Sequence, residues 1–108
     1  VALRNPQGEG LLVTGEKPLS ISAWNFPMKD LEYRPSQVER RHGGSIYKKD
    51  MVWLNIDHKQ MGVGGDNTWG AQVHSEYTIT PHEWEYTFTI QPLHAEENAA
   101  EKAYHVYF

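Results

Sequence analysis

Residues 84–91 read WEYTFTIQ, and this stretch decides the fold class. Its apolar and aromatic residues, Trp84, Tyr86, Phe88 and Ile90, alternate with polar ones. Successive side chains of a β-strand point to opposite faces, so a period of two predicts a strand with one buried face. Aromatic and β-branched residues also favour strands. We therefore expect residues 84–91 to form the clearest strand of an all-β protein.

Shorter segments of the chain repeat this pattern. Residues 51–56 read MVWLNI and also predict a strand, in which Val52, Leu54 and Ile56 point one way and the other three residues point the opposite way. Residues 10–24 are typical of a hairpin, because two apolar runs flank the turn-forming residues 15–18. Strand character returns over residues 73–80 and is interrupted at Pro81. Several short strands separated by turns predict an antiparallel β-sandwich, not a helical or parallel-sheet fold.

Three stretches lack the strand pattern. Residues 25–44 contain two prolines and many charges, which predicts irregular structure with one helical turn near residues 29–32. Residues 61–70 contain four glycines, so we expect a shaped loop. Residues 95–103 are rich in Ala, Glu and Lys and predict a short helix before the aromatic end of the chain.

Composition narrows the class of protein. The chain has 108 residues, about one domain, with a formal net charge of −4. Such a charge argues against a nucleic-acid partner, which needs clustered Lys and Arg, and no apolar run is long enough to cross a membrane. The chain has no cysteine, which fits a reducing compartment, so the cytoplasm is expected over the periplasm. It has neither an initiator methionine nor a signal-peptide pattern, and we expect it to begin within a longer protein.

The glycine-rich loop holds the main candidate for a binding site. It combines a permissive backbone with Asp66, Asn67 and Trp69. Hydroxyl groups of a sugar bind Asp and Asn side chains, and the C–H face of a pyranose packs on an indole ring. The alternative is a structural loop whose Trp69 packs on the sheet. A phosphate site is disfavoured, because the glycine spacing is wrong and no Lys-Ser or Lys-Thr helix start follows.

Other chemistry has weaker support in the sequence. Glycosidases use two carboxyl groups roughly 5 to 9.5 Å apart, and Asp57, Asp66 and Glu76 are candidates only because they flank the loop. The six histidines show no paired metal-ligand spacing, so we expect surface or turn positions and no metal site. Trp53 and Trp84 lie in strand patterns and are expected on the sheet, and packing is the favoured role for Trp24.

One segment of the chain resembles a known family. The run Trp53 to Asp57, the loop core Gly64-Gly65-Asp66-Asn67-Thr68-Trp69 and the following Glu76-Tyr77 resemble the C-terminal domain of the long bacterial β-galactosidases of glycoside hydrolase family 2. In two-chain forms of these enzymes, this region belongs to the small chain. Residues 8–23 also resemble the preceding strand pair. The resemblance covers roughly residues 1–93, and residues 94–108 are an unassigned tail.

The resemblance implies a fold and an activity. The family's last domain is a supersandwich similar to the mutarotase fold, so residues 1–93 would be a C-terminal portion of it. The enzymes hydrolyse terminal β-D-galactosides such as lactose with retention, using two glutamates on a separate barrel domain. The chain alone is therefore expected to lack catalytic residues and activity. Magnesium and sodium ions belong to other domains, so no cofactor or metal is expected in this chain.

The resemblance also implies a site and partners. The tryptophan matching Trp69 stacks on the leaving-group sugar, while Asp66 and Asn67 shape the loop. The expected partners are the galactoside or its glucose moiety, the remaining domains of the enzyme, and further copies in a homo-oligomer. An autonomous, non-catalytic carbohydrate-binding module and a purely structural domain that caps the barrel stay open as alternatives.

Overall fold

A computed structural model describes residues 1–32, 46–67 and 69–108. The chain forms two compact units, one made of residues 1–20 and 58–108 and the other of residues 21–57. Their regular elements are mostly strands, in antiparallel sheets, so the predicted all-β class is confirmed. In the described part of the chain, no helix is long and apolar enough to cross a membrane.

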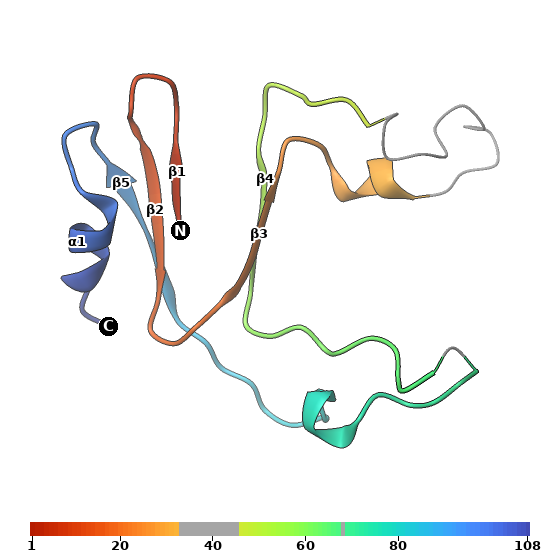
Figure 1. The fold of residues 1–108 in the computed structure, drawn as a ribbon. Helices are drawn as coiled ribbons and strands as arrows, with labels where there is room; N and C mark the ends of the chain where they lie inside the picture. The colour runs from red at the N-terminus through yellow and green to blue at the C-terminus, as the bar shows by residue number, and fades with distance from the viewer. Residues whose placement is uncertain (33–45, 68) are drawn as a thin grey trace. The chain divides into compact units, whose positions relative to one another are not determined.

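The first unit contains a three-stranded sheet in the order β1-β2-β5. It is formed by β1 (Ala2–Arg4), β2 (Gly10–Gly15) and β5 (Phe88–Leu93), which lie side by side in Figure 1. Both pairings are antiparallel, and the second aligns Val13 with Ile90. The unit also contains the 3-10 turn η4 (Ser75–Tyr77) and the helix α1 (Ala99–Tyr104), which contacts β2.

The core of this unit lies on its central strand. Among the described residues, the buried apolar side chains are Leu12, Val13 and Leu93, each at most 2% exposed. Leu12 and Val13 are adjacent in β2, so their side chains point to opposite faces of the sheet. Both faces of β2 are therefore covered.

The second unit contains β3 (Ser20–Trp24), which pairs with β4 (Trp53–Asp57). The side-chain amide of Asn55 donates a hydrogen bond to the hydroxyl of Ser22 at 3.1 Å, which joins the two strands. The 3-10 turn η1 (Met28–Leu31) confirms the helical turn predicted near residues 29–32. The rest of the segment predicted to be irregular, residues 33–44, lies outside the described residues.

The predicted hairpin over residues 10–24 is wrong. Both of its strands exist, but β2 pairs with β1 and β5, whereas β3 pairs with β4. A strand has two hydrogen-bonding edges; β5 pairs with one edge of β2 along residues 10–15, and β1 pairs with the other along residues 10–12. Most of β2 is thus already paired, and β3 pairs with β4 instead.

Two other strand predictions also need correction. Residues 73–80 contain η4 and no strand, although all of them are described. The strand predicted over residues 84–91 begins only at Phe88 and continues to Leu93. Its buried face is the opposite one, since Ile90 is 53% exposed while Leu93 is fully buried. The end of the chain folds back beside this strand, and Thr89 and Gln91 face a hollow lined by α1.

The predicted helix over residues 95–103 is confirmed as to type, but it begins later, at Ala99. Asn98 explains the start, because its side-chain oxygen accepts hydrogen bonds from the N–H groups of Ala100 and Glu101. This is an N-cap, which satisfies two backbone donors that have no partner within the helix. The domain boundary expected at residue 93 stays a prediction.

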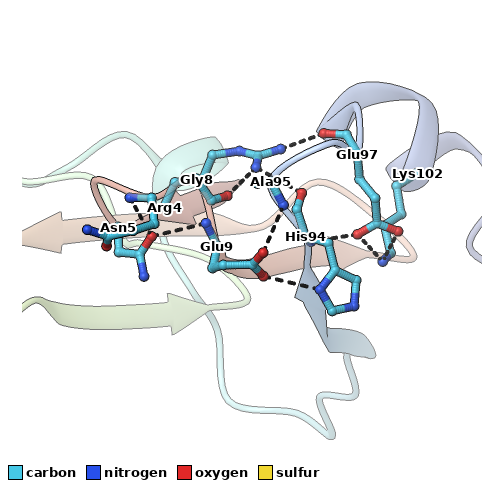
Figure 2. Close-up of polar contacts among 9 residues, drawn as sticks. Arg4, Asn5, Gly8, Glu9, His94, Ala95, Glu97 and Lys102 are labelled. Atoms are coloured by element: carbon cyan, nitrogen blue, oxygen red, sulfur yellow. Dashed lines mark hydrogen bonds and ion pairs between the residues drawn. The ribbon is translucent and has the colours of Figure 1, made fainter.

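Polar contacts hold the end of the chain against the β1-β2 turn (Figure 2). The Arg4 guanidinium donates to the carbonyl oxygens of Gly8 and His94, and to that of Glu97 at 2.6 Å. The Glu9 carboxylate accepts from the Ala95 N–H at 3.3 Å and lies 3.1 Å from His94 Nδ1. Residues 94–97 are thus fixed at both of their ends.

Glu97 makes this attachment sensitive to pH. Its carboxylate accepts hydrogen bonds from the Lys102 ammonium at 2.6 Å and the His94 N–H at 2.7 Å. The Lys102 contact first, and the His94 N–H second, hold the pKa of Glu97 below its ordinary value. A depressed carboxyl pKa contributes stability above the unfolded-state pKa of about 4.3, and this contribution is lost as the pH falls through the folded-state value.

We expect the attachment of α1 to weaken on acidification below about pH 4. Amide NMR signals and hydrogen exchange of Ala99–Tyr104 would follow the change, with the signals of β2 as an internal reference. The matched variant Glu97→Gln should lose part of this acid sensitivity, because it has no carboxyl group to titrate. Equal acid sensitivity in both proteins would contradict the role of Glu97.

Candidate functional site

The glycine-rich loop, residues 61–70, connects β4 to the segment that contains η4, and it forms no regular element. This confirms the predicted loop, of which Thr68 alone lies outside the described residues. The loop is attached at two points. The Gly62 N–H donates to the Tyr77 carbonyl oxygen at 2.9 Å, and Asp66 contacts His74 Nε2 at 2.9 Å.

Gly65 allows a third, closer contact, between the loop and Ala71. A Cβ at this position would collide with the carbonyl group and the Cβ of Ala71. The absence of a side chain therefore lets the two arms of the loop approach each other on either side of Trp69. The loop is narrow because position 65 is glycine.

Trp69 lies at the exposed end of this narrow loop. Its side chain is 91% exposed, so it does not pack on the sheet, as the structural alternative required. The Asn67 side-chain oxygen accepts a hydrogen bond from the Trp69 backbone N–H at 2.8 Å. Such a local turn fixes the backbone from which the indole extends. The predicted residues Asp66, Asn67 and Trp69 thus share one loop, in which the Trp69 side chain is exposed, Asn67 bonds to the loop backbone and Asp66 bonds to His74.

The loop offers binding chemistry and little acid–base chemistry. An exposed indole presents an apolar face to a ligand, and the neighbouring carboxylate of Asp66 accepts hydrogen bonds. Of the other carboxylates considered, Asp57 ends β4 and Glu76 lies in η4. In the described part of the chain, no group of three His, Asp or Glu side chains could hold a metal ion.

The other tryptophans are not part of the loop. Trp53 lies half-buried in β4, as predicted, with the Lys49 ammonium 5.6 Å from the centre of its ring. Trp84 precedes β5 and is 42% exposed, so its predicted place within a strand is wrong. Trp24 contacts Phe26 with ring centres 5.4 Å apart and is 47% exposed.

Sequence reasoning missed two contributors to the loop, His74 and Ala71. Neither is singled out by the sequence. His74 lies in a segment with an apparent strand pattern, and the contribution of Ala71 comes from its backbone. Their positions follow only from the fold of the loop. Of the remaining histidines, His42 lies outside the described residues, and His58 and His82 contact the ring of Trp84.

Comparison with known proteins identifies the family. Residues 1–90 match the family described as beta galactosidase small chain. The chain is 34% identical over 93 residues to a beta-galactosidase of Priestia megaterium, covering 84% of this chain and 8% of that protein. It is 37% identical over 79 residues to a beta-galactosidase of Streptococcus thermophilus, and this match covers 69% of this chain and 8% of that protein. No solved structure matches.

The match covers most of this chain but only a small part of each relative. This chain spans less than a tenth of the length of these curated relatives. The match includes the loop with Asp66, Asn67 and Trp69 and ends within β5, before Leu93. Since the family description covers residues 1–90, most of the sequence, the chain belongs to the beta-galactosidase small-chain family.

Proposed function

We propose that this chain is part of a beta-galactosidase that hydrolyses terminal β-D-galactosides such as lactose, and that Trp69 contacts the leaving-group sugar. The observation that carries the proposal is the 91% exposure of Trp69 on a loop attached by Gly62, Asp66 and Asn67. Binding a sugar to an indole on a flexible loop costs free energy, because the loop loses conformational entropy. The cost is smaller when the loop is already held in place.

The proposed role of Trp69 is positional. Its ring packs against the C–H face of glucose or of an acceptor sugar, and so orients that sugar for departure or for transgalactosylation. Asp66 and Asn67 hold the loop in shape. Proton transfer and the covalent step of a retaining mechanism belong to carboxyl groups outside this chain, as do any magnesium or sodium ions. The chain alone is therefore inactive, and the other domains and further copies of the enzyme are its partners.

In a complete beta-galactosidase that contains this segment, Trp69→Ala should lower kcat/KM for lactose about tenfold. A ring contact contributes on the order of 0.5–1.5 kcal/mol, and about 1.4 kcal/mol corresponds to a factor of ten. Steady-state kinetics would measure the loss, and Trp69→Phe should restore part of it because phenylalanine keeps an aromatic face.

Inhibition by free sugars separates this role from a general structural one. Galactose occupies the other subsite, so its inhibition constant should stay unchanged in Trp69→Ala, while glucose should become a poorer acceptor. Equal weakening of galactose and glucose would refute the proposal. Saturable sugar binding at Trp69 in the 108-residue chain would instead favour an autonomous carbohydrate-binding module.

A further inference from the structure

The first unit also contains a pocket whose lining includes no residue of the loop that carries Trp69. Residues 16–19, 58–59 and 84–87 line a pocket of about 570 Å³. Pockets of roughly 300–1,000 Å³ are typical of small-molecule sites. The Glu16 N–H donates to the Thr87 carbonyl oxygen at 3.1 Å, which holds two of the lining segments together. The pocket is therefore fixed by the backbone as well as by side chains.

Aromatic and imidazole rings form one side of this pocket. Trp84 and Tyr86 are 42% and 44% exposed, and both line it. The His58 ring contacts both of them, stacked on Tyr86 at 5.4 Å and edge-on to Trp84 at 5.3 Å between ring centres. His82 contacts Trp84 at 3.8 Å. These ring contacts help to hold Trp84 and Tyr86 in place, while part of each ring stays exposed.

The charged side chains of the pocket balance one another. The lining contains two carboxylates, of Glu16 and Glu85, and two ammonium groups, of Lys17 and Lys59. Within the described part of the chain, no ion pair joins any of these four groups. The lining thus offers both donors and acceptors without a net charge when His58 is neutral. Such a lining disfavours strongly charged ligands such as nucleotides, and it suits a neutral ligand with many hydroxyl groups.

The Lys59 side chain covers the face of Trp84 that a ligand would use. Its ammonium lies 4.7 Å from the centre of the Trp84 ring and covers the indole by a cation–π contact. An exposed contact of this kind is worth only about 0.5–1 kcal/mol. A ligand can displace the Lys59 ammonium from the Trp84 ring. It then replaces the cation–π contact with two new contacts, a C–H face on the indole and a hydroxyl group hydrogen-bonded to the ammonium.

We propose that the pocket of Trp84, Tyr86 and Lys59 binds a neutral pyranoside, at a site distinct from the Trp69 loop. A pyranose has the two features that the lining requires, an apolar ring face and equatorial hydroxyl groups. The partly open pocket predicts a dissociation constant on the order of millimolar. The site would hold sugar without performing chemistry on it.

The test is an NMR titration of the 108-residue chain with lactose and cellobiose, following the indole N–H signals of its four tryptophans. Tryptophan-to-phenylalanine variants assign the signals, and mannitol, an acyclic polyol, controls for non-specific hydroxyl contacts. We expect a saturable shift of the Trp84 signal with both disaccharides and none with mannitol. Equal shifts with mannitol, or no shift of Trp84 in tens of millimolar sugar, would overturn the proposal.

Variants define the site further. Trp84→Ala and Tyr86→Ala should each weaken binding at least about tenfold, and Lys59→Met should weaken it less. Tyr104→Ala is the matched control, since Tyr104 lies on α1, is 89% exposed and does not line the pocket. If Trp84→Ala disturbs folding, which chemical shifts of β2 would reveal, Tyr86→Ala carries the test. Retained binding in Tyr86→Ala refutes the site.

This inference does not depend on the proposed role of Trp69. The enzyme kinetics of Trp69→Ala test that role, whereas the titration tests the pocket in the 108-residue chain. A shift confined to the Trp69 signal would overturn the pocket proposal and leave the loop as the sugar contact. A saturable shift of Trp84 supports the pocket whatever the kinetics of the Trp69 variant show.

Discussion

Replacing Leu93 by alanine should lower the free energy of unfolding of the 108-residue chain by about 2 to 5 kcal/mol. Leu93 is fully buried and lies opposite Gly10 across the β2-β5 ladder. Small domains are stable by only about 5–15 kcal/mol, and this one has few fully buried apolar side chains among its described residues. Urea denaturation followed by circular dichroism would measure the loss, and the variant could be largely unfolded without denaturant.

Leu11→Ala is the matched control, because it removes the same atoms from the same sheet. Leu11 lies opposite Pro92 in β2 but is 45% exposed. Exposed substitutions of this kind usually change the free energy of unfolding by less than about 0.5 kcal/mol. Equal losses in the two variants would show that Leu93 is not part of the core.

Gly65→Ala in a complete enzyme should lower kcat/KM for lactose by up to about tenfold, the loss expected when the Trp69 ring itself is removed. The added Cβ would collide with the carbonyl group of Ala71, which belongs to the backbone and cannot rotate away. The arms of the loop must then separate and move Trp69. Steady-state kinetics would give the loss, and the Trp69 indole signal of the 108-residue chain should shift.

Gly64→Ala provides the comparison for this prediction. Gly64 has φ +77°, but no heavy atom lies within 4 Å of a Cβ built at this position. The substitution costs roughly 1–2 kcal/mol for the left-handed backbone and creates no collision. It should therefore disturb lactose turnover less than Gly65→Ala. A larger effect at Gly64 would mean that backbone strain, and not the contact with Ala71, shapes the loop.

The strands were predictable where local pattern and pairing agree. Residues 53–57 and 10–15 each form a strand with an available partner, and the local pattern, two alternating faces in the first and an apolar run before a turn in the second, was sufficient to find them. Residues 73–80 have a similar composition, yet they form η4 without a strand partner. Strand propensity reflects packing against neighbours more than an intrinsic backbone preference. A single segment cannot show whether an edge is free to receive it.

The site was predictable as a group of residues but not as a geometry. Glycine content indicated the loop, and Asp66, Asn67 and Trp69 lie in it as expected. The contact of Asp66 with His74 and the approach of Gly65 to Ala71 depend on how the loop closes, for which no residue pattern gives a signal. The pocket of Trp84 and Tyr86 was also missed. Their alternation suggested a sheet face, whereas they precede β5 and meet His58 from a distant segment.

The pairing of β2 with β5 also affects how the chain folds during synthesis. β1 and β2 are close in sequence and can form a hairpin early, whereas the residues of β5 leave the ribosome much later. Pairing between distant segments is slow, because a long loop must close before any contact forms. Until then one edge of β2 is open to other chains. The interval between the two pairings is when this protein is most exposed to aggregation, and when a chaperone would be of most use.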